Sequence, residues 1–196
     1  MSVDEIVQEI ERDRSFYEKS GGGVTLSGGE PLYQPEFTEQ ILKVCKERAI
    51  HTVLDTSGYA EWEILRSILD YTDLVLYDIK HLNSEEHRKL TGKDNRIILE
   101  NAVRVSKESV PMVLRVAVIP GINDNVENLK SLANFVKSLR LGLRVELLPY
   151  HRLNIPKYEA LGREYSLADL RQPSKEHMGK IKKSLKALGV EVFIVS

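Results

Sequence analysis

Polar side chains of both charge signs accompany five short apolar runs in this sequence. Asp55 and Asp78 each stand at or near the end of one run, Lys80 follows two residues after Asp78, and Arg115 stands inside another run. His151 follows the fifth run. Carboxylates bind ammonium groups and ribose diols, whereas Arg and Lys bind carboxylates. The set therefore suits a ligand that carries both charges and several hydroxyls, such as an amino-acid-bearing nucleoside.

A glycine-rich segment follows the first apolar run. Gly28, Gly29 and Glu30 come directly after residues 24–26, and Ser57-Gly58 follow Asp55-Thr56 in the next run. Gly21-Gly22-Gly23 does not form a cradle for a polyphosphate, because it precedes its strand. The sequence contains no Walker motif, no G-x-G-x-x-G motif and no G-x-S-x-G nucleophile elbow. These absences argue against a dinucleotide fold, a P-loop and an α/β-hydrolase.

Each of these features also has a structural explanation. The glycine pair suits a tight turn between strand and helix, and an Asp beside Ser-Gly suits a helix cap. An acid and a base two residues apart on a strand share one face and form a surface ion pair of small energy. An Arg within an apolar strand is costly unless it is paired. These explanations apply, in this order, to Gly28-Gly29, to Asp55, to Asp78 with Lys80, and to Arg115. His151 has a structural explanation as well, as a solvated loop residue.

Helix and strand patterns alternate along the chain. Apolar residues at helical spacing predict helices near residues 2–19, 36–48, 62–69, 97–105, 126–139 and 173–188, and Ser2 with Glu5 predicts a capping box. Short apolar runs predict strands at residues 24–26, 51–56, 74–79, 112–119, 144–148 and 190–195. Residues 80–96 begin with a polar loop, and residues 150–172 are long, polar and irregular.

This alternation predicts an α/β fold with a parallel sheet. The strand runs are almost continuously apolar, which indicates cover on both faces. A doubly wound sheet and a (βα) barrel remain alternatives on pattern alone. In both folds, ligands bind at the carboxyl ends of the strands, which is where the polar residues stand.

Length and composition narrow the class of protein. The chain of 196 residues predicts a single domain, 1–196, and its net charge of -1 excludes a bulk electrostatic binder of nucleic acid. No apolar stretch is long enough to span a membrane, and the acidic first ten residues do not resemble a secretory signal. The one cysteine, Cys45, forms no internal disulfide and cannot hold an iron–sulfur cluster alone. We therefore expect a cytoplasmic protein.

Five segments together resemble one known family. They are residues 21–31 (GGGVTLSGGEP), 54–58 (LDTSG), 74–80 (LVLYDIK), 114–121 (LRVAVIPG) and 146–151 (ELLPYH). In this order, and along nearly the whole chain, they resemble the glycyl-radical-enzyme activating enzymes of the pyruvate formate-lyase type, which are radical S-adenosylmethionine proteins.

The resemblance implies a partial parallel (βα)6 barrel and two cofactors, S-adenosylmethionine and a [4Fe–4S] cluster. In the family, the cluster binds S-adenosylmethionine and cleaves it reductively, and the resulting 5′-deoxyadenosyl radical abstracts a hydrogen from a glycine of the partner enzyme. It also implies two kinds of partner: a glycyl radical enzyme, and an electron donor such as flavodoxin or ferredoxin.

The resemblance further implies roles for individual residues. Gly28, Gly29 and Glu30 would line the methionine amino end of S-adenosylmethionine. The rest of its pocket, around the carboxylate and the ribose, would come from Asp55, Ser57, Asp78, Ile79, Lys80, Arg115 and His151. A monovalent cation would be held by Asp55, Thr56 and Asp78.

The sequence departs from the family at the cluster. The family's C-x-x-x-C-x-x-C loop and the strand before it are absent, and Cys45 shares a helix face with Phe37 and Ile41, which predicts a buried thiol and not a cluster ligand. We therefore expect an N-terminally truncated chain without a cluster, inactive alone. A binding or docking module for a glycyl radical enzyme or a nucleoside, without turnover, is the alternative. A third option is an ordinary (βα) enzyme that uses Asp78 and His151 for acid–base chemistry.

Overall fold

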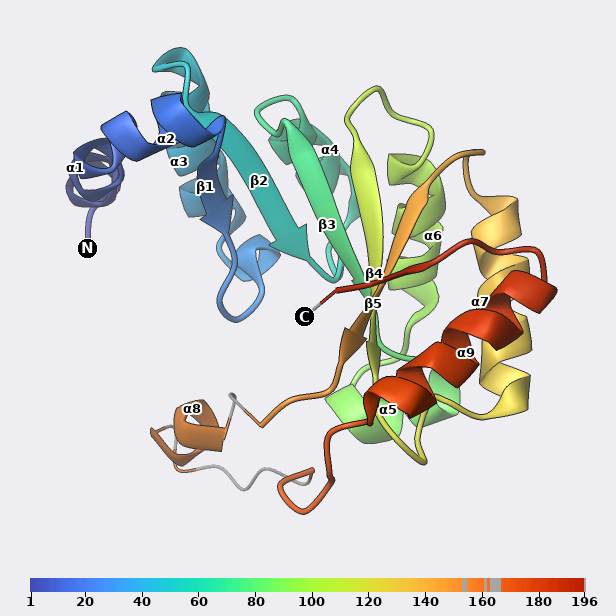
Figure 1. Cartoon of the computed structure of the whole chain (residues 1–196). Coiled ribbons are helices and arrows are strands. Elements are labelled where there is room, and N and C mark those ends of the chain that lie inside the picture. The colour runs from blue at the N-terminus through green and yellow to red at the C-terminus, as the bar shows by residue number, and fades with distance from the viewer. Residues whose placement is uncertain (153–154, 161, 163–166, 196) are drawn as a thin grey trace. The chain divides into compact units, whose positions relative to one another are not determined.

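The strands of this chain form one sheet of α/β type. The computed structural model describes residues 1–152, 155–160, 162 and 167–195. Within these ranges, the sheet has six strands in the order β1-β2-β3-β4-β5-β6, and the pairings β1–β2, β2–β3 and β5–β6 are parallel. The strands are β1 (Gly23–Leu26), β2 (His51–Thr56), β3 (Leu74–Ile79), β4 (Met112–Val118), β5 (Arg144–Pro149) and β6 (Phe193–Ile194) (Figure 1).

Helices connect the strands, as the alternating pattern predicts. Before β1 come α1 (Val3–Arg12) and α2 (Arg14–Ser20), and after it the 3-10 helix η1 (Pro31–Tyr33) and α3 (Pro35–Glu47). The later helices are α4 (Trp62–Leu69), α5 (Ser84–Thr91), α6 (Arg96–Val105), α7 (Val126–Ser138), α8 (Ile155–Ala160) and α9 (Lys175–Ala187).

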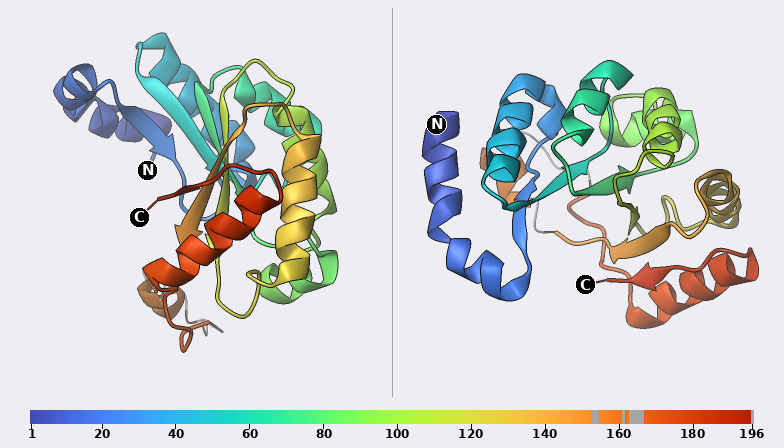
Figure 2. Two further views of the ribbon diagram at one scale, coloured as in Figure 1. Left: turned by 45° about the vertical axis from the view of Figure 1, so that its right-hand side comes forward. Right: turned by 90° about the horizontal axis from the view of Figure 1, so that it is seen from above.

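The chain divides into two compact units. Unit 1 comprises Met1–Asp78 and Asp94–Leu114. In it, Leu26 pairs with Leu54, and Leu54 with Val75. Helices α3 and α4 lie on the same side of the strands (Figure 2). Their apolar side chains fill the core of this unit with those of β2 and β3. The fully buried members of this core include Leu42, Leu54, Leu65, Ile68, Val75 and Tyr77.

Unit 2 comprises Ile79–Lys93 and Arg115–Ser196. Helices α7 and α9 lie side by side in it (Figures 1 and 2). Its core joins these helices to β4 and β5. The buried members of this core include Val116, Val118, Leu132, Val145, Leu147, Ile181 and Leu185. The prediction of a single domain, 1–196, stays a prediction.

The strands bury one face more completely than the other. Alternate residues of β2, β3 and β4 are buried, and the residues between them are half-buried. Asp55, Asp78 and Arg115 all belong to the half-buried set. Because side chains alternate across a strand, each of these charged groups stands on the less covered face of its own strand.

Several predicted boundaries change. The first helix breaks at Asp13 into α1 and α2, although Ser2 and Glu5 do form the predicted capping box. Helix α5 replaces part of the predicted polar loop: Asn83 caps its amino end, and His87 is its one buried residue. A helix with so little apolar surface leaves a weak periodic signal. The last strand, predicted over residues 190–195, is the two-residue β6.

The long polar segment after β5 is partly helical. Helix α8 lies within it, and residues 153–154, 161 and 163–166 are outside the described part of the chain. Of the helices that the structure describes, none is long and apolar enough to cross a membrane.

Candidate functional site

A carboxylate joins the loop after β1 to the loop after β2 in unit 1. Oε1 of Glu30 accepts from the hydroxyl of Thr56 at 2.5 Å and from the backbone N–H of Leu32 at 3.2 Å. Oε2 accepts from the backbone N–H of Ser57 at 2.9 Å and from its hydroxyl at 2.5 Å. We call Glu30 with these three partner residues the Glu30 bridge. It connects the segment that contains Gly28 and Gly29 to the Ser57-Gly58 turn.

A second anchor holds the same turn from helix α6. Nδ2 of the buried Asn101 donates to the carbonyls of Gly58 and Ala60, at 2.9 and 2.8 Å. Tyr77, which is fully buried, donates its hydroxyl to the carbonyl of Ile98 at 2.7 Å, and burial raises the pKa of this phenol well above its usual value. The Tyr77 hydroxyl also lies against Gly58, where a Cβ atom would come within 1.9 Å of it.

Asp55 and Asp78, the two candidate ligand aspartates of unit 1, stand on the same face of β2 and β3. Asp55 is the register partner of Leu76, and Asp78 follows two residues later on the face of Leu76. The hydroxyl of Ser27 donates to Oδ2 of Asp55 at 3.1 Å. Asp55 is therefore bound to the residue that follows β1 and does not cap the following helix, whose N-cap is Glu61.

The glycine pair before Glu30 leaves its backbone accessible. Gly28 has a φ of 124°, a conformation that disfavours any side chain. Within the described chain, a Cβ atom built on Gly28 or Gly29 would meet nothing within 4 Å. A ligand could therefore approach the main chain here directly.

In unit 2, a buried asparagine fixes the main chain after β3. Nδ2 of Asn123 donates to the carbonyls of Lys80 and Ala117, at 2.9 and 2.7 Å, and its Oδ1 accepts from the N–H of Ile119 at 2.8 Å. Asn128 donates to the carbonyl of Asn123 at 2.7 Å. These contacts hold the end of β4 against the residue that follows β3.

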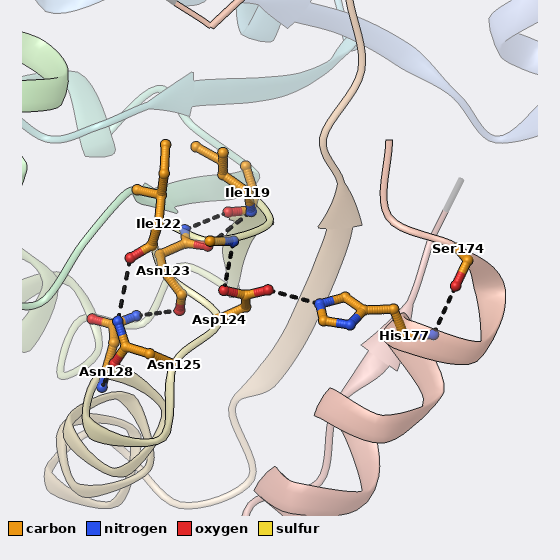
Figure 3. A network of polar contacts seen from close by, with 10 residues as sticks. Ile119, Ile122, Asn123, Asp124, Asn125, Asn128, Ser174 and His177 are labelled. Carbon is orange, nitrogen blue, oxygen red and sulfur yellow. Dashed lines mark hydrogen bonds and ion pairs between the residues drawn. The ribbon is translucent and has the colours of Figure 1, made fainter. Parts of the chain in front are cut away.

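The same loop is bound to helix α9. Oδ1 of Asp124 accepts from the N–H of Gly121 at 2.9 Å, and its Oδ2 contacts Nε2 of His177 at 2.7 Å (Figure 3). His177 lies in the first turn of α9, where its own N–H donates to the N-cap residue Ser174. Helix α9 thus helps to hold the loop that follows β4.

The structure distributes the predicted site residues between the two units. Unit 1 carries Gly28, Gly29, Glu30, Asp55, Thr56, Ser57 and Asp78. Unit 2 carries Ile79, Lys80, Arg115 and His151. Within unit 1, hydrogen bonds bring Glu30 together with Thr56 and Ser57. In unit 2, Ile79 is buried, Lys80 and Arg115 are half-buried, and His151 is exposed. A common pocket for all of them remains a prediction.

The residues of this chain do not fit a [4Fe–4S] cluster. Cys45 is fully buried in a cluster of side chains with Ile10, Ile41 and Ile50, as predicted. Burial raises the pKa of its thiol, which disfavours the thiolate that binds iron. Nowhere in the described ranges do three His, Cys, Asp or Glu side chains gather as metal ligands would.

The donors of unit 1 do fit an S-adenosylmethionine ligand. The carboxylates of Asp55 and Asp78 are suited to an ammonium group and a ribose diol. The bare backbone at Gly28 and Gly29 is suited to a close approach. The hydroxyl of Thr56 is already hydrogen-bonded to Glu30 and to the N–H of Gly58. The carboxylates of Asp55 and Asp78 are therefore the stronger candidate ligands for the predicted cation.

Asn101 and Asn123, the two asparagines that support these loops, were not identified from the sequence. Asn101 stands in α6 as one polar residue of an apolar helix face, and Asn123 follows Pro120-Gly121 in what reads as a turn. The sequence does contain one indication of Asn101: it is a polar residue at the spacing of the buried positions of α6, and a buried amide needs hydrogen-bond partners.

The chain is similar to known proteins of one superfamily. The model of the radical SAM superfamily matches residues 1–133. A pyruvate formate-lyase-activating enzyme of Clostridium pasteurianum is 43% identical over 188 residues, which are 96% of this chain and 79% of that protein. A (2S)-3-sulfopropanediol dehydratase activating enzyme of Klebsiella oxytoca is 41% identical over 174 residues, 87% of this chain and 55% of that protein.

A solved structure has the same fold. The crystal structure of a domain of a pyruvate-formate lyase-activating enzyme from Bacteroides vulgatus superposes with a TM-score of 0.74 and 32% identity, over 89% of this chain and 99% of that domain. This similarity confirms the predicted α/β fold class. The chain therefore belongs to the radical SAM superfamily and, within it, to the activating enzymes of glycyl radical enzymes.

Proposed function

We propose that this chain is the S-adenosylmethionine-binding part of an activating enzyme that generates a glycyl radical on a partner enzyme. The observation that carries the proposal is the placement of Asp55 and Asp78 on one face of the paired strands β2 and β3, with Asp55 hydrogen-bonded to Ser27, the residue before the accessible backbone of Gly28 and Gly29. Membership of the family supports the choice of ligand.

The residues of unit 1 would bind the ammonium group and the ribose. Asp55 bears the carboxylate nearest to the loop after β1, because Ser27 is its hydrogen-bond partner, and we assign it to the ammonium group. Asp78, farther along the same face, is assigned to the ribose hydroxyls. Both bonds would be charge-assisted, and both carboxylates are already held on rigid strands, which reduces the entropy lost on binding.

The residues of unit 2 would bind the carboxylate of the ligand. Lys80 follows β3 directly and Arg115 stands on the half-buried face of β4, and each provides a cation. Arg matches a carboxylate with two parallel hydrogen bonds, whereas Lys provides a point charge. Ile79 and His151 complete the set, His151 as an exposed residue beyond β5.

The partner of this chain would be a glycyl radical enzyme. The relatives named above activate a lyase in one organism and a dehydratase in another. Identities of 43% and 41% to two such proteins do not favour one kind of partner over the other. We therefore assign the class of partner and leave its own substrate open.

Reductive cleavage of S-adenosylmethionine requires an iron–sulfur cluster, and the single buried thiol of Cys45 does not suit one. We propose that the chain alone binds S-adenosylmethionine without cleaving it, and that the cysteines of a working cluster come from outside this sequence. Anaerobic incubation with iron and sulfide should give no [4Fe–4S] absorption or electron paramagnetic resonance signal. A stoichiometric, reducible cluster on this chain would contradict the proposal.

The same buried thiol favours a second candidate, a module that binds the ligand or the partner without turnover. The two candidates differ in what happens when the chain is supplied with a peptide that carries the missing cysteine motif. An activating enzyme should then cleave S-adenosylmethionine under reducing conditions, whereas a binding module should bind it and leave it intact.

Equilibrium dialysis with labelled S-adenosylmethionine tests the ligand assignment. Loss of a charged hydrogen-bonding partner costs about 2 kcal/mol or more, so Asp55→Asn and Arg115→Gln should each weaken binding at least about 30-fold. Glu127→Gln, on the exposed first turn of α7, is the matched control and should bind as the unchanged chain does. Unchanged affinity in both site variants, with intact circular dichroism, would exclude the assigned pocket.

A further inference from the structure

The carboxylate of Glu30 is fully used inside the protein. An ionised carboxylate offers about four acceptor positions. Leu32 and Thr56 fill the two of Oε1, and the N–H and hydroxyl of Ser57 fill the two of Oε2. An incoming ammonium group would therefore have to displace one of these donors before Glu30 could bind it.

Three of the four donors come from a distant part of the chain. Thr56 and Ser57 are 26 and 27 residues away in sequence, whereas the N–H of Leu32 belongs to the loop of Glu30 itself and caps the 3-10 helix η1. Thr56 is also 3% exposed and accepts from the N–H of Gly58. The Glu30 bridge thus continues, through Thr56, into the turn that Asn101 holds from its other side.

The elements on either side of the bridge carry the candidate ligand groups. Gly28 and Gly29 precede Glu30 directly, and Asp55 precedes Thr56 directly. Ser27 and Asp55 are hydrogen-bonded to each other, so the two loops meet at this point as well. By fixing the distance between the loop after β1 and the loop after β2, Glu30 sets the position of the backbone of Gly28 and Gly29 relative to the carboxylate of Asp55.

We propose that Glu30 is a positioning residue and not a ligand of the ammonium group. Its carboxylate holds the loop after β1 against the loop after β2, and recognition of the ammonium group rests on Asp55. This inference deepens the proposed function, on which the identity of the ligand depends, and it gives Glu30 a different role from the one that the family resemblance implies.

Hydrogen exchange of the full chain without any ligand tests the bridge by itself. Hydrogen bonds to a charged group are strong, so Glu30→Gln should raise the exchange rates of the Leu32 and Ser57 amides by about tenfold or more. Glu30→Asp keeps the charge and loses one methylene of reach. It should release the Ser57 amide and leave the local Leu32 cap in place. Glu61→Gln, on an N-cap without a side-chain bond, is the matched control and should change neither amide.

If both amides exchange in Glu30→Gln and Glu30→Asp as they do in the unchanged chain, Glu30 does not hold the loops. Glu30→Asp is the milder substitution and decides the question if Glu30→Gln fails to fold.

A double-mutant cycle on S-adenosylmethionine affinity separates positioning from direct contact. If Glu30 acts through Ser57, then Glu30→Gln combined with Ser57→Ala should weaken binding no more than about twofold beyond Glu30→Gln alone. Fold-losses that multiply would mean that Glu30 and Ser57 act on the ligand independently, which contradicts a role of Glu30 through Ser57. Absence of any S-adenosylmethionine binding by the unchanged chain, with the amides protected as expected, would refute the proposed function and leave the bridge intact.

Discussion

The side-chain amide of Asn123 donates to the backbone carbonyl of Lys80 at 2.9 Å, across 43 residues of sequence. The same amide nitrogen donates to Ala117, and the amide oxygen accepts from Ile119. Asn123 is 3% exposed, so water cannot replace these bonds without opening unit 2. One side chain therefore fixes the main chain on which the candidate ligand residue Lys80 stands.

Asn123→Ala should strongly destabilise the protein. Three backbone groups lose their partner, in one buried and two part-buried hydrogen bonds, and unsatisfied buried groups cost about 1–3 kcal/mol each without full additivity, so we expect a loss of about 3 kcal/mol. Urea denaturation followed by circular dichroism measures it. Asn134→Ala, at an exposed position of α7, is the control and should stay within about 0.5 kcal/mol of the unchanged chain. A loss below about 1 kcal/mol in Asn123→Ala would contradict the network.

Gly58→Ala should be among the most damaging glycine substitutions in unit 1. The residue has a φ of 71°, and the new Cβ would lie 1.9 Å from the hydroxyl of the buried Tyr77. Backbone strain and overpacking together should cost about 3 kcal/mol or more.

Gly92→Ala is the matched control for this prediction. Its φ is 78°, but the described neighbours leave open space around the new Cβ, so only the backbone strain of about 1–2 kcal/mol applies. Thermal and urea unfolding of both variants compares the two costs. Equal losses would mean that the contact with Tyr77 contributes nothing.

The stability of unit 1 should fall in acid because of Glu11. Hydrogen bonds from Arg14, supported by Arg48, lower the pKa of this carboxyl from 4.5 to about 2. Since the folded-state pKa lies below the unfolded one, Glu11 stabilises the protein above pH 4.5. That contribution is lost as the pH falls from 4.5 towards 2.

Unfolding free energies measured across this pH range test the role of Glu11. In Glu11→Gln, the curve should be flatter than in the unchanged chain, and the difference between the two should vanish near pH 2. Glu36→Gln, at an exposed position in the first turn of α3, is the control. A Glu11→Gln curve parallel to that of the unchanged chain would show that Glu11 does not titrate with folding.

The thiol of Cys45 should react slowly in the folded protein. It is fully buried among Ile10, Ile41 and Ile50, and its raised pKa leaves little thiolate at neutral pH. Labelling with a disulfide reagent should proceed only as fast as unit 1 opens, and at least about a hundredfold slower than in denaturant. The denatured chain provides the reference rate. If the folded protein were labelled as fast as the denatured chain, the thiol of Cys45 would not be buried, and Cys45 would again be a candidate metal ligand.

Local signals in the sequence were enough to predict most of the elements. The strands at residues 51–56 and 74–79 are as predicted, because each is a short run of apolar and β-branched residues between polar turns. The capping box of Ser2 and Glu5 and the buried face of Cys45 were predicted because their partners lie within one or two helical turns. The polar residues at the strand ends, and the family to which the chain belongs, also followed from the sequence.

The tertiary structure alone decided how the side chains of the site are used. The partners of Glu30 are 26 and 27 residues away, and those of Asn101 and Asn123 include residues 43 away, so no local pattern names them. The sequence showed a carboxylate beside two glycines and therefore suggested a ligand. Only the parallel pairing of β1 with β2 places Thr56 and Ser57 within hydrogen-bonding distance of that half-buried carboxylate, which accepts their hydrogen bonds.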